Sequence, residues 1–240
     1  MTLLVMLSMV TTTWAVEVNY YDPTAAGEQT KQADATAITN QTTLGTTGET
    51  TWYYVSGTVT VTTRIDVLGT VNLILADDCT FTAENGIRVT DGDNDNKNKL
   101  NIYAQSYGND EHSGKLVACS NDRGDAAIGG NAGQFGNVAE DGEDAGAITI
   151  YGGNITAQGD IGGGHGGVGV SEHTKPGTGG HGGDATVTIH GGNIKVNGTI
   201  GGGAGGLGDD SGETQETGGY NDSDGVDGTP GSGTVIIGWT

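Results

Sequence analysis

The chain is poor in several residue types that common protein classes require. It has only nine Lys and Arg residues against 30 Asp and Glu residues, which gives a net charge of -21. Nucleic-acid binding and adsorption to anionic membranes both need clustered basic side chains, so this balance argues against both functions. The two cysteines, Cys79 and Cys119, permit one disulfide at most and exclude a small disulfide-stapled fold. Their offset positions in the repeat described below predict that they stay unpaired.

Proline and aromatic residues are also scarce, whereas glycine is abundant. The chain has three prolines, 5% aromatic residues and 47 glycines, of which 40 lie in residues 101–240. The glycines do not recur at every third position along the chain, and with so few prolines a collagen-like protein is excluded. Long helical patterns are absent as well, which argues against a helix-rich globular enzyme.

The first residues have the pattern of an export signal. Residues 2–16 carry no charge, and the apolar run over residues 3–10 is too short to cross a bilayer. Thr13 and Ala15 are the small residues that a signal peptidase accepts, so we predict a signal peptide over residues 1–15. The basic start of such a signal is lacking, and a buried N-terminal strand is the alternative. The pattern predicts a mature chain that is secreted or held at the cell surface, without membrane insertion.

An internal repeat is the most informative feature of the sequence. Residues 148–169 return 39 positions later as residues 187–208, and 14 of these 22 positions are identical. Several substituted positions keep their polarity: Ile148 and Val187 are both apolar, and Thr156 and Lys195 are both polar. Apolar and polar residues alternate with a period of two, which indicates short strands that each turn one side inward.

Each repeat contains three very short strands separated by Gly or Asn corners. Stacking such units about 4.8 Å apart pairs every strand in parallel with its equivalents, and buries inward side chains that one unit cannot bury alone. The sequence therefore predicts an all-β fold, a right-handed parallel β-helix (solenoid) over residues 56–240, preceded by a Thr/Ala/Gln-rich lead or cap over 16–55. A disordered glycine-rich tail is the alternative. The expected inward residues are Val71, Leu73, Phe81, Leu100, Ile102, Leu116, Ile148, Ile150, Ile155, Ile161, Val187, Ile189, Ile194, Val196, Ile200, Val235 and Ile237.

The repeats resemble those of a known group of proteins. Blocks of the type Ile-Thr-Ile-x-Gly-Gly-x-Ile-x-Ala followed by Ile-Gly-Gly-Gly, at 148–164 and 187–203, resemble bacterial secreted and cell-surface repeats of the pectate-lyase-like β-helix superfamily. Degenerate relatives of these blocks cover residues 58–146. The resemblance implies the fold, and beyond it a broad range of activities that includes pectate lyases, polygalacturonases, polysaccharide-binding modules and adhesin stalks.

The variable length of the units falls at one point, after the Ile-Gly-Gly strand. The insertions are rich in Gly and Asp and lie near residues 91–98, 131–146, 165–185 and 204–233. Insertions at one corner of a stack gather on one side and commonly form a binding face. We therefore expect the loops on this side to carry the function.

Two acidic clusters in these loops are candidate Ca²⁺ sites, because alternating carboxylates suit an oxygen-coordinating loop. The EF-hand pattern is not met, and a solvated acidic turn is the alternative. The candidate ligands are Asp91, Asp93 and Asp95 in one cluster and Asp222, Asp224 and Asp227 in the other. The three histidines of one insertion, His165, His173 and His181, are spaced by eight, which does not fit the short spacings that zinc prefers.

Sugar rings bind proteins by stacking on aromatic faces, so aromatic residues mark the candidate ligand-binding positions. These are Tyr103, Tyr151 and Tyr220, with Trp52 and Trp239 as further platforms. The expected partner is a polysaccharide or a cell-wall glycan. It is either a neutral glycan or an acidic glycan that Ca²⁺ bridges to the acidic loops.

Catalysis is the alternative that the resemblance raises. A lyase of this superfamily uses an Arg base beside Ca²⁺ carboxylates, and Arg88 with Asp91 and Asp93 is the candidate group, ahead of Arg123 with Asp122 and Asp125. A hydrolase needs paired carboxylates at defined separations, and here the acidic residues lie in loops away from aromatics. The sequence favours a non-catalytic polysaccharide-binding or adhesive module over a purely structural stalk, and over a polysaccharide lyase or glycoside hydrolase.

Overall fold

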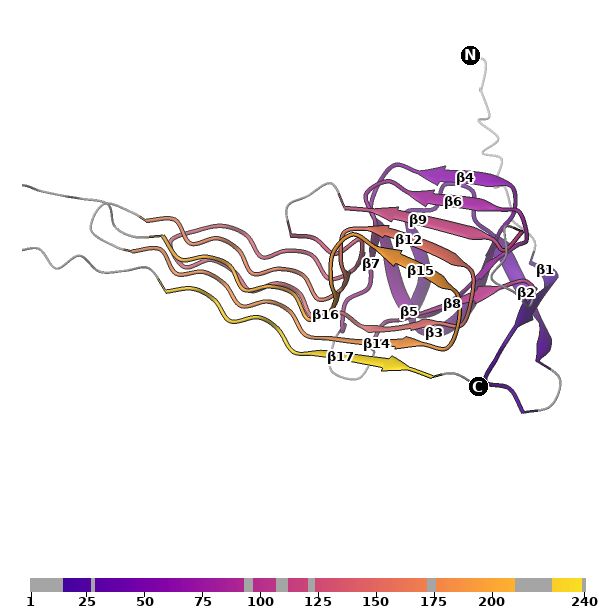
Figure 1. Cartoon of the computed structure of the whole chain (residues 1–240). Helices are drawn as coiled ribbons and strands as arrows, with labels where there is room; N and C mark the ends of the chain where they lie inside the picture. The colour runs from indigo at the N-terminus through magenta and orange to yellow at the C-terminus, as the bar shows by residue number, and fades with distance from the viewer. Residues whose placement is uncertain are drawn as a thin grey trace, which may run out of the picture.

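A computed structural model describes residues 15–26, 29–92, 97–106, 112–120, 124–171, 176–209 and 226–238. These residues are all-β and contain no helix, so none of them forms a helix that could span a membrane. Figure 1 shows a body of stacked strands from which long loops extend on one side. The predicted signal peptide falls almost wholly outside the described residues.

The strands form two sheets. The larger sheet has twelve strands, and its main path runs β16-β13-β10-β7-β5-β8-β11-β14-β17, with β1, β2 and β3 joined to β5. Its strands are β1 (Val16–Tyr21), β2 (Thr30–Ala37), β3 (Thr43–Val55), β5 (Ile65–Leu75), β7 (Ile87–Arg88), β8 (Lys99–Ala104), β10 (Ile128–Gly129), β11 (Ala147–Ile150), β13 (Ile161–Gly162), β14 (Ala185–Ile189), β16 (Ile200–Gly201) and β17 (Gly233–Ile237). The smaller sheet consists of β4 (Thr58–Val61), β6 (Thr80–Ala83), β9 (Lys115–Cys119), β12 (Asn154–Gln158) and β15 (Asn193–Val196).

Equivalent strands of successive repeats pair with one another in parallel. Ile148 of β11 lies between Leu100 of β8 and Val187 of β14, so the sequence offset of 39 residues corresponds to one step of the stack. The second and third strands of each repeat pair in the same way, β12 between β9 and β15 and β13 between β10 and β16. The parallel pairing predicted from the repeat is confirmed.

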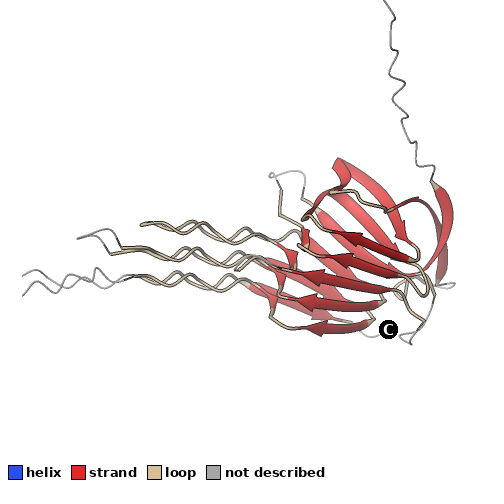
Figure 2. Ribbon diagram, turned by 90° about the horizontal axis from the view of Figure 1, so that it is seen from above, coloured by secondary structure: helices blue, strands red, loops and turns tan. Residues whose placement is uncertain are grey.

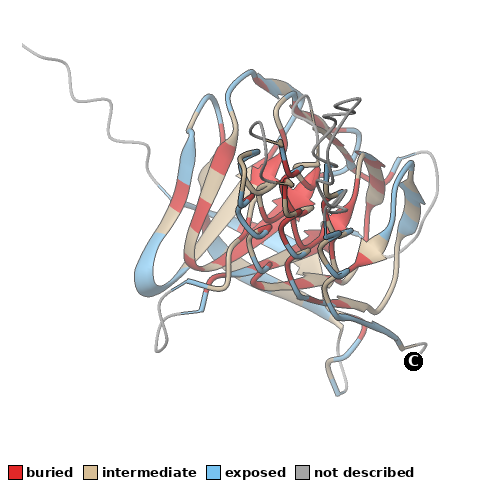
Figure 3. Ribbon diagram, turned by 90° about the vertical axis from the view of Figure 1, so that its left-hand side faces the viewer, coloured by how far each residue is buried: buried red, intermediate tan, exposed pale blue. Residues whose placement is uncertain are grey.

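The core lies between the two sheets and follows the predicted alternation. In β11 and β12, every second residue is buried and the residues between are half-buried or exposed. Figure 3, which looks along the loops toward the body, shows buried residues toward the middle of the body. The predicted inward residues that are at most 1% exposed are Val71, Leu73, Phe81, Leu100, Ile102, Leu116, Ile148, Ile150, Ile155, Ile161 and Val187.

The open end of the stack departs from the prediction. Val235 and Ile237 of β17 have the predicted register, because they pair with Val187 and Ile189 of β14. They are nevertheless 40% and 60% exposed. An inward position is buried only when a further layer covers it, and within the described residues no strand lies beyond β17.

The opposite end of the stack is covered. Strand β3 pairs in parallel with β5, and the end of β2 pairs in parallel with β3 at Thr36 and Ala37, so parallel pairing begins well before residue 56. Strands β1 and β2 pair in antiparallel fashion, and their Val18 and Ala35 are buried in a small second core. The lead segment is therefore folded and forms a cap.

Both cysteines are free thiols, as expected from their offset positions. Cys79 is buried, and this burial raises the pKa of its thiol to about 11. Cys119 is half-buried at the end of β9, and desolvation raises its pKa as well. A raised pKa keeps a thiol protonated and unreactive at neutral pH.

One column of the core tests this architecture. Ile150 is fully buried, whereas Ile237 occupies the equivalent position two strands along at 60% exposure. Ile150→Ala should lower the free energy of unfolding by about 2–5 kcal/mol, because it removes buried methyl groups and leaves a cavity. Ile237→Ala should cost less than about 1 kcal/mol, as surface substitutions do. Urea denaturation of both variants measures the difference, and equal losses would contradict the assignment of the column.

Candidate functional site

The glycine-rich insertions form one continuous structure, which we call the arm. Each insertion runs away from the body and returns, so that the arm has three outward limbs and three return limbs (Figures 1 and 2). Gly136 and Gly169 pair in parallel between outward limbs, and Val138, Thr178 and Val226 pair in parallel between return limbs. The described limbs span 130–136, 163–169 and 202–208 outward and 138–145, 178–185 and 226–232 on return.

A three-residue rule organises the hydrogen bonds of the arm. Gly166 donates its N–H to the carbonyl of Ala204 in the neighbouring outward limb, at 2.8 Å. Gly167 donates to the carbonyl of Glu140 in the return layer, at 2.9 Å, and Val168 is exposed. In limb 163–169 successive triplets thus donate once within the layer and once between layers, and the third residue of the second triplet, Val168, turns its side chain outward. A period of three is that of polyproline II-type helices, which lack internal hydrogen bonds and must find partners in neighbouring segments.

Glycine is required where the two layers meet. A Cβ atom on Gly206 would lie 1.8 Å from the carbonyl oxygen of Gly167, and one on Gly180 would lie 1.9 Å from that of Glu140. The glycines have no period of three over the whole chain, but they have one that is confined to the limbs. The signal was present locally, in runs such as residues 163–169, and only its register along each limb reveals it.

Acidic side chains supply the remaining acceptors on the return layer. Asp141 accepts the backbone N–H of His181 at 2.6 Å, and Asp144 accepts that of Asp184 at 2.7 Å. Asp184 in turn accepts the N–H of Ser232 at 2.6 Å. These carboxylates satisfy N–H groups of the return limbs that have no carbonyl partner, and the N–H of Thr229 finds Nδ1 of His181 instead.

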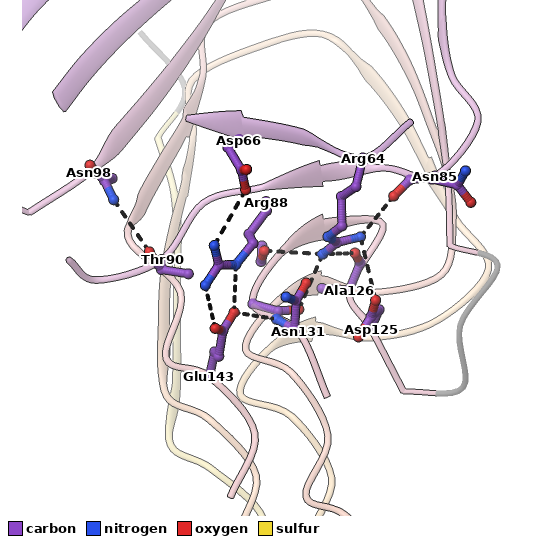
Figure 4. A network of polar contacts seen from close by, with 12 residues as sticks. Arg64, Asp66, Asn85, Arg88, Thr90, Asn98, Asp125, Ala126, Asn131 and Glu143 are labelled. Atoms are coloured by element: carbon purple, nitrogen blue, oxygen red, sulfur yellow. Dashed lines mark hydrogen bonds and ion pairs between the residues drawn. The ribbon is translucent and has the colours of Figure 1, made fainter. Parts of the chain in front are cut away.

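Two arginines anchor the root of the arm in the body (Figure 4). Arg88 of β7 binds both carboxylate oxygens of Glu143, and its Nε lies 2.9 Å from Oε2. Glu143 also accepts the N–H of Asn131, so one carboxylate holds the start and the end of the first limb pair. The hydrogen bonds that Arg88 donates to Glu143 raise the pKa of Arg88, and its second partner is Asp66 at 3.4 Å. Arg88 is therefore held as a cation, which does not suit it to act as a base.

Arg64 closes the same junction from the body side. Its guanidinium donates to the carbonyls of Asn85 and Ala126, both at 2.9 Å, and lies 3.9 Å from Asp125. Burial lowers the pKa of Arg64, and Asp125 opposes this shift. The other members of the proposed Arg123 group, Arg123 and Asp122, lie outside the described residues.

A His–Asp pair joins the arm to the body next to β13, because Asp160 immediately precedes that strand. The imidazole Nε2 of His165 contacts Asp160, which is largely buried and also accepts the N–H of Thr199. The hydrogen bond to Asp160 raises the pKa of His165. Burial acts to raise the pKa of Asp160, but the bonds from His165 and Thr199 outweigh it and the pKa is lowered.

The predicted metal ligands that lie within the described residues, Asp91 and Asp227, have partners other than each other. Asp91 forms an ion pair with Lys97 at 2.9 Å, and Asp227 accepts the N–H of Gly208 at 2.7 Å. No group of three His, Cys, Asp or Glu suited to a metal ion occurs among the described residues. The remaining candidates, Asp93, Asp95, Asp222 and Asp224, lie outside the described residues, as does His173.

The predicted aromatic platforms stack on one another. The rings of Tyr103 and Tyr151 are parallel within 7° at a centroid distance of 4.3 Å, and His190 stacks on Tyr151 at 5.1 Å. Trp52 covers Tyr103 from the other side at 5.5 Å, and burial raises the pKa of Tyr103. Tyr220 and Trp239 lie outside the described residues. The stacked rings pack against one another on the body, and Tyr103 and Trp52 also belong to the small core with Val18 and Ala35 of the cap.

A row of exposed apolar side chains lies on the arm, and sequence analysis did not identify it. Phe135, Val168 and Leu207 are 77%, 49% and 65% exposed. They are equivalent residues of the three outward limbs, because Gly136 donates to the Val168 carbonyl and Gly169 to the Leu207 carbonyl. On the return layer, Val138 and Val226 flank Thr178 and are 77% and 63% exposed. We call these two rows, Phe135/Val168/Leu207 and Val138/Thr178/Val226, the distal apolar band.

Comparisons with known proteins identify no relative. No family model, no curated protein and no solved structure matches the chain. The function is therefore argued from the geometry of the arm and the body.

The packing of the arm predicts the effect of single methyl groups. Gly206→Ala should break the contact between layers, because its Cβ would overlap the Gly167 carbonyl. Hydrogen exchange of the amides in 163–169 and 202–208 should accelerate at least about tenfold, whereas amides of β8 and β11 should keep their protection. Ala204→Val, at an exposed third position of the same limb, is the control and should leave exchange unchanged. Unaltered exchange in Gly206→Ala would contradict the two-layer packing.

The His165–Asp160 pair predicts a pH dependence of stability. Because the pKa of His165 is raised on folding, its contribution is complete below the unfolded value near 6.5 and is lost as pH rises through the folded pKa. The lowered pKa of Asp160 adds stability above its unfolded value, and this is lost only in acid. The difference in melting temperature between the protein and His165→Asn should therefore be larger at pH 5.5 than at pH 9. A difference that does not change with pH would show that the pair is not charged.

Proposed function

We propose that this chain is a secreted or cell-surface, non-catalytic adhesive module that binds polysaccharide through its arm. The observation that carries the proposal is the distal apolar band, which places large apolar side chains in rows on a hydrogen-bonded scaffold far from the core. Exposed apolar groups in such an array mark interaction sites rather than chance exposure. The body, in this proposal, serves to hold the arm.

The finer description of the body is part of the proposal. We infer that the repeats wind as a right-handed parallel β-helix. Equivalent strands pair in parallel at every step, and crossovers between parallel strands are almost always right-handed. In such a winding, each unit must emit its insertion at the same corner, which accounts for the gathering of all three loops into one arm.

The geometry of the band favours a repeating, neutral partner. Successive third positions along a limb lie about 9 Å apart at 3.1 Å per residue, and neighbouring limbs lie about 4.8 Å apart. The apolar row repeats from limb to limb, which suits a polymer that repeats its contacts. The band itself carries no charge, and the carboxylates nearby repel polyanions, so a neutral polysaccharide fits best. The apolar C–H faces of sugar rings are the groups that would pack on Phe135, Val168 and Leu207.

The scaffold also lowers the cost of binding. Backbone hydrogen bonds of 2.7–3.3 Å fix the limbs within and between the layers. A surface that is already ordered loses little conformational entropy when it binds, which increases affinity for a given contact area.

The residues that the family resemblance suggests for catalysis are committed to structure. Arg88 is neutralised by Glu143 and Asp66, and Asp91 is paired with Lys97. These contacts support a non-catalytic module.

The stacked aromatic rings favour a second candidate, a purely structural spacer. Sugar-binding platforms present a free ring face, whereas Tyr103 and Tyr151 cover each other. A spacer would need the rigid body and no binding surface. The exposed band on the arm is what sets the adhesive module ahead of this alternative.

A retention experiment separates these functions. The protein should be retained on at least one insoluble neutral polysaccharide, and the triple variant Phe135→Ser/Val168→Ser/Leu207→Ser should bind at least about tenfold more weakly, since each buried apolar side chain contributes about 1.5–3 kcal/mol. Val16→Ser, which removes a side chain 42% exposed on β1, is the matched control and should bind normally. Released sugar or unsaturated product would support an enzyme, and no retention on any polysaccharide would support the spacer.

The same experiment tests assistance by calcium, which stays a prediction. Retention and melting temperature are measured with Ca²⁺ and with chelator, because a ligand of the folded state stabilises it by mass action. If the acidic turns bind Ca²⁺, Asp91→Ala should reduce the difference between the two conditions. Identical curves would assign these carboxylates to the hydrogen bonds and ion pairs described above.

A further inference from the structure

The last strand of the larger sheet leaves the core of the stack open. The inward column that includes Leu73, Ile102 and Ile150 is fully buried. The same column ends at Ile237, which is 60% exposed, and the neighbouring column ends at Val235, which is 40% exposed. Next to them, Ile189, Ile194, Val196 and Ile200 are only partly buried. At this end of the stack, apolar residues of the inward columns are therefore exposed to solvent.

The outward side of β17 is apolar as well. Ile236 is 49% exposed, and its column continues through Thr188, Thr149, Asn101 and Asn72 to Trp52 of β3. The position is polar in β14, β11, β8 and β5, and the ring of Trp52 is covered by Tyr20 and Tyr103. Strand β17 therefore exposes apolar side chains on both sides, and within the described residues no strand pairs with its outer edge.

Acidic side chains are absent from the segments at this end although the chain is strongly acidic. Residues 185–208 and 228–240 contain no Asp or Glu, whereas the chain has 30 in total. The charged or titratable side chains of these segments are Lys195 and His190 alone. Natural edge strands are usually protected from pairing by charged side chains or proline. The edge limb of the arm has Pro230 at a position whose N–H would point away from the other limbs, and β17 has no such protection.

We propose that the open end binds a second copy of this chain, with β17 of one copy pairing in antiparallel fashion with β17 of the other about a twofold axis. A partner with the same net charge of -21 can approach closely only through a surface free of carboxylates, and this end is such a surface. The pairing satisfies the free backbone edges and buries Val235 and Ile237 of both copies.

The opposite end of the stack does not offer a matching surface. Its apolar residues Ile38, Leu44 and Val61 are at most 3% exposed, and the strand edge there presents Thr58 and Thr60. Head-to-tail contacts between the open end of one copy and the capped end of the next therefore gain little burial. A twofold contact uses the open end twice and closes the assembly at two copies.

The oligomeric state of the full chain tests the proposal. Sedimentation equilibrium over a hundredfold range of concentration should give twice the mass of one chain, and the double variant Ile236→Lys/Ile237→Lys should give half that mass. Both substituted residues are already exposed, so the melting temperature of the monomeric variant reports whether it stays folded. Val16→Lys, on the exposed β1 strand, is the control and should remain dimeric.

A cysteine scan separates the twofold arrangement from other contacts. Single cysteines at residues 234–237, in a Cys119→Ser background, are oxidised and resolved without reductant. In a twofold antiparallel pair one of these positions faces its own copy and should form a covalent dimer, while Val16→Cys should not. A protein that stays monomeric at all concentrations would overturn the proposal, and so would open-ended polymers. Neither outcome depends on whether the arm binds polysaccharide.

Discussion

Backbone hydrogen bonding between equivalent residues of successive repeats supports both halves of this protein. In the body, it takes the form of parallel strands stacked at a constant register, as at Leu100, Ile148 and Val187. In the arm, the same step from repeat to repeat aligns Phe135, Val168 and Leu207. The two parts differ in what fills the space between their layers. The body buries apolar side chains, whereas the described limbs of the arm meet backbone to backbone at glycine.

This difference explains the unusual composition. A chain that builds part of its mass from glycine limbs needs few apolar residues, and it also needs acceptors for N–H groups that face no carbonyl. Asp141, Asp144 and Asp184 provide those acceptors, and Glu143 provides one at the root. A substantial part of the acidity has a structural role that needs no metal. The negative charge also keeps exposed glycine-rich limbs from associating with those of other molecules.

Much of the body could be predicted from the sequence, because the repeat fixes register and alternation together. Once Ile148 is aligned with Val187, the burial of Ile150 and Ile155 follows from a period of two. The exposure of Val235 and Ile237 does not follow, since the pattern is the same whether or not another layer covers it. The arm escaped prediction for a different reason. The period of three along a limb is informative only within that limb, and over the whole chain it is hidden by the strands between the insertions. The partners of Arg88 were likewise beyond reach, because Glu143 lies 55 residues away and meets it only when the first insertion returns to the body.

The direction of the hydrogen bonds in the arm has a mechanical consequence. The bonds between limbs run across the arm, perpendicular to its length. A load applied at the outer end along the arm axis therefore strains many of them at once in shear. A load applied sideways would instead open the limbs one at a time, from the edge limb that carries Pro230. An attachment made through this arm should hold longer against pulling along its axis than against peeling, because forced opening is governed by the rate of the first rupture.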